Sequence, residues 1–276
     1  MNARDWIAWA ESELAPVSDS ARLDAELLLA AGAGIDRAKL FADPERPLDD
    51  AARARLAANV ARRSRGEPVA YILGRKEFYS LALVVSADVL VPRPETELLV
   101  DAALARLPEQ GGRVIDLGTG SGAIALALKH ERPRARVVAT DCDAAALSVA
   151  RANGRRLGLD VEWCRADWFA GVADGHFDLI VSNPPYIPSG DRAFATLAHE
   201  PRHALDGGAD GLDAYRALLP TARERLVRGG QLLVEHGYDQ REALIALAAA
   251  HAFGVDEALD DLAGRPRVLC LRVDAR

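Results

Sequence analysis

The sequence predicts an α/β protein in which a mainly parallel, twisted, doubly wound sheet follows a small helical bundle and a β-hairpin linker. The first 70 or so residues carry apolar side chains at helical spacing and show no strand-like alternation. From residue 112 onward, apolar strand-like runs alternate with helical patterns, which is typical of a parallel sheet flanked by helices. We therefore expect three parts: a helical domain at 1–73, a hairpin linker at 74–92 and the α/β domain at 93–276.

The composition is that of a globular protein with a sizeable core. Half of the 276 residues are hydrophobic, enough for one large domain and a smaller companion. There are 34 Lys and Arg against 41 Asp and Glu, and the formal net charge of -7 argues against a broad polyanion-binding surface. The chain begins with an early acid, Asp5, and has no unbroken apolar stretch of ~20 residues. We therefore expect a soluble, cytoplasmic protein without signal peptide or membrane span.

The cysteines match neither a disulfide framework nor a zinc-ligand pattern. They are odd in number and widely spaced, at Cys142, Cys164 and Cys270. We expect ordinary buried thiols in a reducing compartment, and no metal site.

Helical spacing recurs in four stretches of the first domain, at 6–14, 18–32, 37–41 and 49–65. Gly32 and Gly34 end the second stretch, and Pro44 follows the third. The fourth opens with acids and closes with arginines, a charge order that suits a helix dipole. A bundle this small is not expected to carry chemistry alone, so we expect it to recognise a partner.

The rest of the chain is predicted from its alternating runs. Short β-type runs between 76 and 91 indicate a hairpin, and Pro92-Arg93-Pro94 then interrupts the chain before a helix expected at 95–106. Strands are expected at 114–117, 137–140, 161–164, 177–181, 231–235 and 268–273. Helices are expected between them at 123–129, 144–157, 212–226 and 239–250.

A glycine-rich turn follows the first strand of the α/β domain. The strand runs directly into alternating glycines and then a helix, so that backbone can approach a ligand at the carboxyl end of the strand. Nucleotide-like cofactors bind at such places, although an isolated turn of this kind can be a simple connection. The Gly-x-Gly-x-Gly spacing departs from the dinucleotide fingerprint and disfavours hydride transfer. The candidate cofactor-binding residues of this segment are Asp116, Gly118, Thr119, Gly120, Ser121 and Gly122.

Acids at three strand ends extend the candidate cofactor site. Asp116 can meet a cation such as the methionine ammonium of S-adenosylmethionine, and would repel a pyrophosphate. Asp141 can accept both ribose hydroxyls; the alternative is an N-cap of the next helix, which Asp143 could provide equally well. Asp167 can bond an adenine amino group and Trp168 can flank the ring, although Trp168 could equally belong to the core.

Asn183-Pro184-Pro185-Tyr186 follows a strand-like run and so reaches the same sheet edge as the glycine turn. A nitrogen conjugated to a π-system is a poor nucleophile, so a catalyst must hold it firmly against an electrophilic methyl group. The Asn183 carboxamide oxygen and the Pro184 carbonyl can grip both hydrogens of an NH2 group, and Tyr186 presents a flat face. Alone the tetrapeptide could be a polyproline turn, but beside a cofactor turn it indicates methyl transfer to an amide-type nitrogen.

Together these motifs resemble those of the HemK/PrmC family of protein-glutamine methyltransferases, which act on peptide chain release factors. The resemblance covers nearly the whole chain, and its more discriminating parts are Phe78-Tyr79, 91–97, 200–205 and 232–237. It implies a Rossmann-like class I S-adenosylmethionine-dependent methyltransferase domain. It also implies that Gly118 to Gly122, Asp141, Trp168 and Asn183 bind the cofactor. Asn183, Pro184, Pro185 and Tyr186 would hold the glutamine of the Gly-Gly-Gln loop of class 1 release factors.

The tetrapeptide leaves a second acceptor open, the exocyclic amino group of a flipped adenine or cytosine in nucleic acid. The net charge and the lack of an evident basic stripe weigh against duplex binding, and a helical N-terminal region suits a protein partner. Intact Asn183 and Asp116 disfavour a catalytically silent binding module. We therefore expect a monomer that acts on release factors without direct contact to nucleic acid or membrane.

The sequence does not decide the role of one loop and of four titratable residues. The stretch 189–199, beside the expected substrate cleft, is the least family-like part of the chain. Four titratable residues can be ascribed equally well to the cleft or to ordinary surface charge, and these are Glu95, Glu97, His199 and Glu235.

Overall fold

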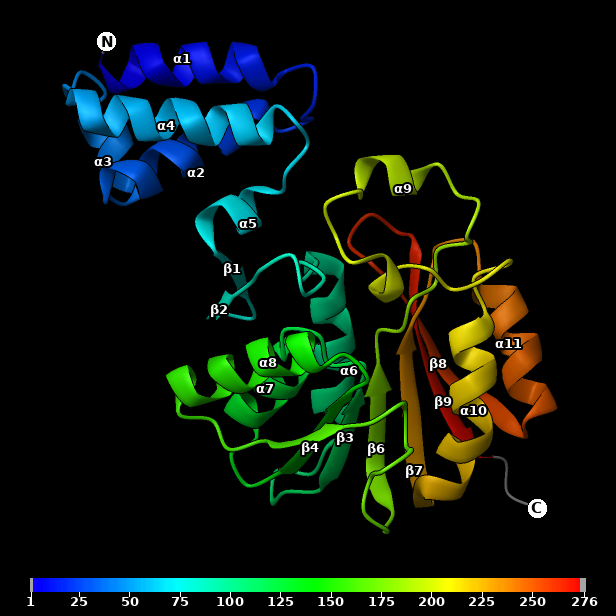
Figure 1. The fold of residues 1–276 in the computed structure, drawn as a ribbon. Coiled ribbons are helices and arrows are strands. Elements are labelled where there is room, and N and C mark those ends of the chain that lie inside the picture. Colours follow the sequence, from blue (N-terminus) through cyan, green and yellow to red (C-terminus); the bar gives the residue numbers. More distant parts are fainter. Residues whose placement is uncertain (1, 274–276) are drawn as a thin grey trace. The chain divides into compact units, whose positions relative to one another are not determined.

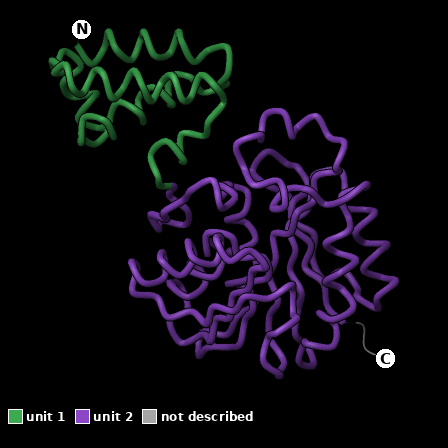
Figure 2. The backbone as a smooth tube through the Cα atoms, in the orientation of Figure 1, with its two compact units in different colours: residues 1–75 green, residues 76–276 purple. Residues whose placement is uncertain are grey.

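The computed structural model describes residues 2–273 and divides into two compact units, 1–75 and 76–276 (Figure 2). The first unit is helical, with α1 (Ala3–Leu14), α2 (Ala21–Ala33), α3 (Arg37–Ala42), α4 (Asp50–Arg63) and α5 (Val69–Leu73). Its core gathers small and aliphatic side chains with Trp6, which is 1% exposed. Asn2 and Asp49 accept backbone N–H groups at the starts of α1 and α4, and Gly34 ends α2 in the left-handed conformation. The four predicted helices are present, and α5 was not predicted because five residues are too few to show a period.

The second unit begins with a hairpin and continues as an alternating α/β domain (Figure 1). Its strands are β1 (Arg75–Phe78), β2 (Leu81–Val84), β3 (Arg113–Leu117), β4 (Arg136–Asp141), β5 (Glu162–Arg165), β6 (Phe177–Ser182), β7 (Leu226–Glu235), β8 (Phe253–Asp260) and β9 (Pro266–Val273). Its helices are α6 (Glu97–Arg106), α7 (Ala123–Glu131), α8 (Ala144–Leu157), α9 (Ala193–Thr196), α10 (Asp213–Arg225) and α11 (Arg241–Ala250), with short 3-10 turns η1 (Pro94–Thr96) and η2 (Arg202–Ala204).

The large sheet has the strand order β5-β4-β3-β6-β7-β9-β8 within the described residues. Strand β9 pairs antiparallel with β7 and β8, whereas β5, β4, β3, β6 and β7 pair in parallel. The chain moves outward from β3 to β4 and β5 and then returns to place β6 on the other side of β3. Leu117 pairs with Ser182 across this junction, so the glycine turn and Asn183 follow directly from paired residues. Ligands bind at such a reversal of strand order.

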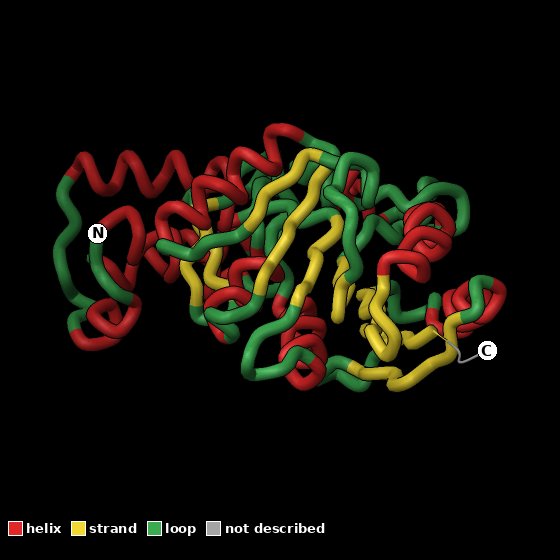
Figure 3. Tube along the Cα trace, turned by 90° about the horizontal axis from the view of Figure 1, so that it is seen from below, coloured by secondary structure: helices red, strands yellow, loops and turns green. Residues whose placement is uncertain are grey.

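Helices cover both faces of this sheet (Figures 1 and 3). One apolar cluster joins α6 and α7 to one face, and a second joins α10 and α11 to the other. Val114 and Ile115, neighbours on β3, belong to opposite clusters because successive strand residues point to opposite faces. The predicted doubly wound α/β fold is therefore confirmed. None of the helices within residues 2–273 has the length and apolar character needed to cross a membrane.

Three expectations need correction. The hairpin ends at Val84, and the apolar residues 89–91 form a loop without strand pairing. Strand β8 was not predicted, because its sequence is rich in acids and it lies exposed at the edge of the sheet. The cysteines are not uniformly buried: Cys142, directly after the end of β4, is exposed, and Cys164, on the edge strand β5, is half-buried.

Candidate active site

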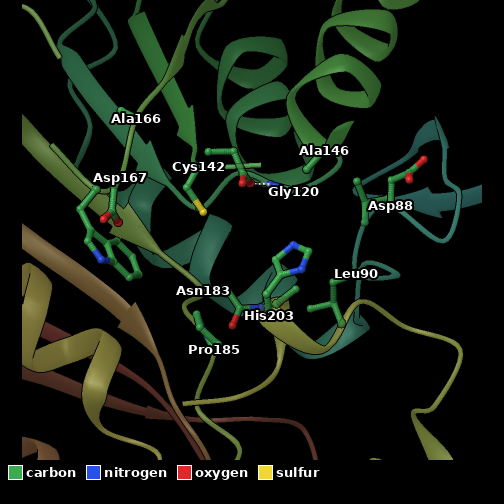
Figure 4. A pocket seen from close by; sticks show the side chains of 15 residues that line it. Asp88, Leu90, Gly120, Cys142, Ala146, Ala166, Asp167, Asn183, Pro185 and His203 are labelled. Atoms are coloured by element: carbon green, nitrogen blue, oxygen red, sulfur yellow. Dashed lines mark hydrogen bonds between the residues drawn. The ribbon is translucent and has the colours of Figure 1, made fainter. Parts of the chain in front are cut away.

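A pocket of about 170 Å³ lies at the carboxyl edge of the parallel strands (Figure 4). Its wall includes many of the residues predicted for the site, namely Gly118, Gly120, Asp141, Asp167, Trp168, Asn183 and Pro185. They come from the ends of β3, β4, β5 and β6, four strands that are neighbours in the sheet. The sheet edge thus brings together residues that are spread over almost 70 positions of the sequence.

The glycine turn offers backbone to the pocket. Gly118 and Gly120 have φ of 75° and 55°, a region that favours glycine. A Cβ atom at either residue would meet nothing within 4 Å, so a side chain there would project into open space at the pocket wall. The other predicted turn residues do not line the pocket, and these are Asp116, Thr119, Ser121 and Gly122. This cradle of bare backbone fits a nucleoside-type group such as that of S-adenosylmethionine.

Asp116 is buried behind the glycine turn and holds the turn by hydrogen bonds. Its Oδ2 accepts hydrogen bonds from Thr119 Oγ1 at 2.6 Å and from Ala125 N at 3.2 Å. Its Oδ1 is buried and has no hydrogen-bond partner among residues 2–273. Burial raises the pKa of this carboxyl to about 7, and the nearby Asp141 carboxylate adds to the rise. A cationic group bound nearby would compensate this buried charge, which fits the ammonium of the predicted cofactor.

Asp116→Asn should stabilise the protein without its cofactor by on the order of 2–4 kcal/mol at pH 8. The folded-state pKa of about 7 lies above the ordinary value of 3.8, so this carboxyl contributes stability only at low pH, and that contribution is lost as the pH rises through 7. An amide keeps the acceptor for Thr119 and Ala125 and removes the buried charge. Urea unfolding at pH 5 and pH 8 measures the gain, with the exposed Asp174→Asn as control. A gain that is equal at both pH values would contradict the raised pKa.

Asp141 ends β4 and is buried, with 8% of the residue exposed. Its Oδ2 accepts from Gly120 N and its Oδ1 from Asp143 N, both at 2.9 Å. The N-cap of α8 is Asp143, which accepts from Ala145 N at 2.8 Å. The alternative role considered for Asp141 is therefore taken by its neighbour. Each carboxylate oxygen of Asp141 keeps a lone pair for a ligand hydroxyl, and burial raises the pKa of the group.

Trp168 holds an unfavourable backbone conformation at the pocket wall. Its φ of 52° lies in the left-handed region, which costs a bulky residue about 1–3 kcal/mol. The side chain lines the pocket and also packs against the apolar cluster under α10 and α11. The two roles considered for it, core residue and ring contact, are thus compatible. Asp167 beside it also faces the pocket (Figure 4).

A second cavity of about 210 Å³ adjoins the first through shared wall residues. Its lining is mainly apolar and consists of Leu90, Arg93, Asn183, Pro184, Tyr186, Ile187, Leu197, Ala204 and Leu205. Leu90, Asn183 and Ala204 belong to the walls of both cavities. An apolar lining with a few polar groups suits a flexible methylene chain that ends in a neutral amide. Asn183 therefore lies where a cofactor in one cavity and an acceptor in the other would meet.

Behind Asn183 and Tyr186 lies a buried polar network. Asn183 Nδ2 donates to Thr96 Oγ1 at 3.2 Å, and the Tyr186 hydroxyl donates to Glu235 Oε1 over a long 3.4 Å. Glu235 is 1% exposed, so its ascription to surface charge is wrong. Burial raises the pKa of Glu235 to about 7, and burial beside Glu235 also raises the pKa of Tyr186. Gln240 Nε2 holds the Tyr186 carbonyl at 2.9 Å.

Part of the first pocket comes from segments for which sequence reasoning proposed no role. These wall residues are Asp88, Val89, Leu90, Cys142, Ala146, Ala166, His203 and Ala204. The carboxylate of Glu200, 7% exposed, joins two of these segments by accepting from Val91 N at 3.0 Å and pairing with Arg93. Cys142 and Ala166 could have been found, because each is adjacent to a predicted residue. Contacts between positions more than 100 residues apart leave no local signal.

Glu95, Glu97 and His199 were the other residues for which both a place in the cleft and ordinary surface charge had been considered. Glu97 accepts from Tyr79 N at 2.8 Å and holds the hairpin turn, while Glu95 and His199 are exposed. The uncertain stretch 189–199 contains the short helix α9 and contributes Leu197 to the second cavity. No cluster of His, Cys, Asp or Glu within residues 2–273 could hold a metal ion.

Two family models match the chain, the PrmC N-terminal domain at residues 5–74 and the methyltransferase small domain at residues 78–208. The release factor glutamine methyltransferase of Coxiella burnetii is 46% identical over 262 residues, which cover 94% of this chain and 95% of that protein. The enzyme of the same name from Salmonella typhimurium is 42% identical over 275 residues, 99% of each chain. The structure of a methyltransferase from Pyrococcus furiosus shares the fold, with a TM-score of 0.56 and 20% identity over 79% of this chain and 95% of that one.

These relatives match both domains from end to end at an identity that establishes common descent. The PrmC N-terminal model covers the helical unit, and the methyltransferase small-domain model covers residues 78–208 of the α/β unit. The chain belongs to the release factor glutamine methyltransferase family, a family of S-adenosylmethionine-dependent methyltransferases.

Proposed function

We propose that this enzyme transfers a methyl group from S-adenosylmethionine to the side-chain amide nitrogen of the glutamine in the Gly-Gly-Gln motif of class 1 peptide chain release factors, and so supports translation termination. The observation that carries the proposal is the position of Asn183 on the walls of two adjoining cavities. One cavity has the glycine backbone and acids that suit a nucleoside cofactor. The other has the apolar walls that suit a glutamine side chain.

The cofactor would supply an electrophilic methyl group, and the residues of this chain would bind and orient both reactants. Asp141 would accept the ribose hydroxyls, and Asp167 and Trp168 would hold the adenine. The main chain of Gly118 to Gly122 would lie along the cofactor. The buried Asp116 carboxylate behind this turn would balance the cofactor's positive charge.

The substrate amide would be held by acceptors. The Asn183 carboxamide oxygen and the Pro184 carbonyl would each accept one N–H of the glutamine NH2 group. These bonds strengthen as positive charge develops on the nitrogen during methyl transfer, so they stabilise the transition state more than the bound substrate. Pro185 stiffens the segment, and Tyr186 would lie against the planar amide. After transfer, one proton leaves the nitrogen, and the product is the N-methyl amide.

The experiment that tests the proposal uses methyl-labelled S-adenosylmethionine and three acceptors. These are a class 1 release factor, the same factor with its loop glutamine replaced by alanine, and a mixture of DNA and RNA. We expect label in the unaltered factor alone. Label in nucleic acid alone would overturn the proposal in favour of an adenine or cytosine amino-methyltransferase, and label in the altered factor would overturn the assignment of the glutamine.

We further propose that residues 1–73 recognise the release factor, that 74–92 lead into the catalytic domain at 93–276, and that the enzyme acts as a cytoplasmic monomer. The formal net charge of -7 supports a protein substrate over direct nucleic-acid binding.

A further inference from the structure

We propose that Glu200 is a specificity-determining residue: by neutralising Arg93, it makes the second cavity accept a neutral carboxamide and exclude a carboxylate. This inference rests on the proposed function, in which the second cavity holds a glutamine side chain. The side chains of glutamine and glutamate have nearly the same size and shape, and a cavity wall that only fits the shape does not separate such isosteres. The charge on the cavity wall therefore has to contribute to the distinction.

Arg93 is the charged residue on the wall of the second cavity. The rest of this wall, within the described part of the chain, is apolar or neutral and consists of Leu90, Asn183, Pro184, Tyr186, Ile187, Leu197, Ala204 and Leu205. Glu235 accepts from the Tyr186 hydroxyl but is not itself a wall residue. A guanidinium is always positively charged, and its planar fork binds a carboxylate through two parallel N–H bonds. An unpaired Arg93 would therefore attract a glutamate side chain into the cavity.

Glu200 cancels this positive charge from inside the protein. Its side chain is 3% exposed, against 34% for Arg93, and its Oε1 accepts from the Arg93 guanidinium. Its Oε2 accepts from Val91 N at 3.0 Å. Both carboxylate oxygens are thus occupied, and the backbone bond fixes the carboxylate beside Arg93. The two residues, 107 positions apart in the chain, present the cavity with a pair that has no net charge.

A carboxylate that entered this cavity would lose its hydration without gaining a free cation, which is costly in apolar surroundings. It would also face the Asn183 carboxamide oxygen and the Pro184 carbonyl, the two acceptors proposed for the substrate NH2 group, and has no N–H to donate to them. A neutral carboxamide has a much smaller desolvation cost and can donate to both acceptors. The Glu200–Arg93 pair thus adds an electrostatic selection to the selection made by the two acceptors.

The quantity that tests the proposal is a ratio of two dissociation constants. One is the Kd of a release factor whose loop glutamine is replaced by glutamate, and the other is the Kd of the unaltered factor. Calorimetric titration of the enzyme saturated with S-adenosylhomocysteine, which has no methyl group to transfer, gives both values. Contacts elsewhere between the two proteins affect both constants alike and cancel in the ratio. We expect the wild-type enzyme to bind the glutamate factor at least about 10-fold more weakly.

Glu200→Gln keeps an oxygen for Val91 N and removes the negative charge. The amide NH2 group then faces the donors of Arg93, so the guanidinium is free to bind a carboxylate in the cavity. We expect the ratio to fall by about 10- to 100-fold, the effect of a hydrogen bond to a charged group. Asp174→Asn is the control for net charge, because it removes one negative charge from a fully exposed position before the amino end of β6. It should leave the ratio unchanged.

Arg93→Gln changes the wall charge in the opposite direction. The Glu200 carboxylate then lacks its cation, so the ratio should rise, by about 3- to 10-fold at pH 8. The double variant Arg93→Gln/Glu200→Gln has a neutral wall again, and its two amides can hydrogen-bond to each other. Its ratio should return to within about threefold of the wild-type value. Loosening of the two loops would not give opposite changes in the two single variants, and Arg93→Gln keeps the proposal testable if Glu200→Gln does not fold.

Failure of the proposed function gives a different result from failure of this inference. If the wild-type enzyme does not transfer labelled methyl to the unaltered factor, the proposed function fails. If it does, and the ratio in folded Glu200→Gln equals that of the wild type, the specificity role of Glu200 is overturned. The role is equally overturned if the double variant keeps the low ratio of Glu200→Gln, since Arg93 would then not be the cause, or if Arg93→Gln lowers the ratio.

Discussion

We expect Asn183→Ala to lower kcat for methylation of a release factor by about 1,000-fold, as removal of one preorganised hydrogen-bond partner of a transition state does. The carboxamide is one of the two acceptors proposed for the substrate NH2 group, and methyl transfer increases the charge that it stabilises. The remaining wall of the cofactor pocket stays intact, so S-adenosylmethionine should still bind, with a Kd raised only a few-fold.

Single-turnover transfer of labelled methyl and calorimetric titration of S-adenosylmethionine separate these two effects. Asn59→Ala on α4, at a half-buried position in the helical unit, is the matched control and should turn over normally. Normal turnover in Asn183→Ala would show that the grip on the substrate nitrogen is unnecessary.

Asp141→Asn is expected to raise the Kd for S-adenosylmethionine by about 10- to 100-fold, the effect of losing hydrogen bonds of roughly 1.5–3 kcal/mol to a charged acceptor. Both oxygens of Asp141 already accept backbone N–H groups, from Gly120 and Asp143. An amide would turn its NH2 group toward one of these donors, which both disturbs the glycine turn and removes an acceptor for the ribose. At saturating cofactor, kcat should change little, because Asp141 does not line the second cavity.

Calorimetry at several temperatures gives the Kd, and thermal unfolding shows whether the variant is folded. The exposed Asp160→Asn should bind the cofactor like the wild type. A folded Asp141→Asn protein with unchanged Kd would remove Asp141 from the proposed cofactor site.

The parallel sheet could be predicted because each of its buried strands is marked by a short run of neighbouring residues. Buried strands such as β3 and β6 appear as apolar runs that end in a glycine or an Asn-Pro pair, and the intervening helices show their own period. The edge strand β8 lacked this signal, since an exposed strand needs no apolar run. The loop at 89–91 gave a false signal, because its valines are buried against the domain without pairing to a strand.

The candidate site was predictable where it follows a strand. Gly118, Asp141, Asp167 and Asn183 each stand at or just after the carboxyl end of a parallel strand, and the sheet alone brings them to one edge. That His203 lines the pocket could not be predicted from the sequence. Its segment, η2, is held near the pocket by contacts between distant loops, such as those that Glu200 makes with Val91 and Arg93.

The sequence by itself determined the fold class, the family and the tetrapeptide that would hold a planar NH2 group, because all three are written in contiguous residues. Only the tertiary structure decided that Asn183 lies between two cavities and that Glu235 is buried behind it. The physical reason is that burial and hydrogen-bond direction depend on which elements pack together. Glu235 is inside because β7 lies between β6 and β9, and Thr96 reaches Asn183 across 87 positions of the chain.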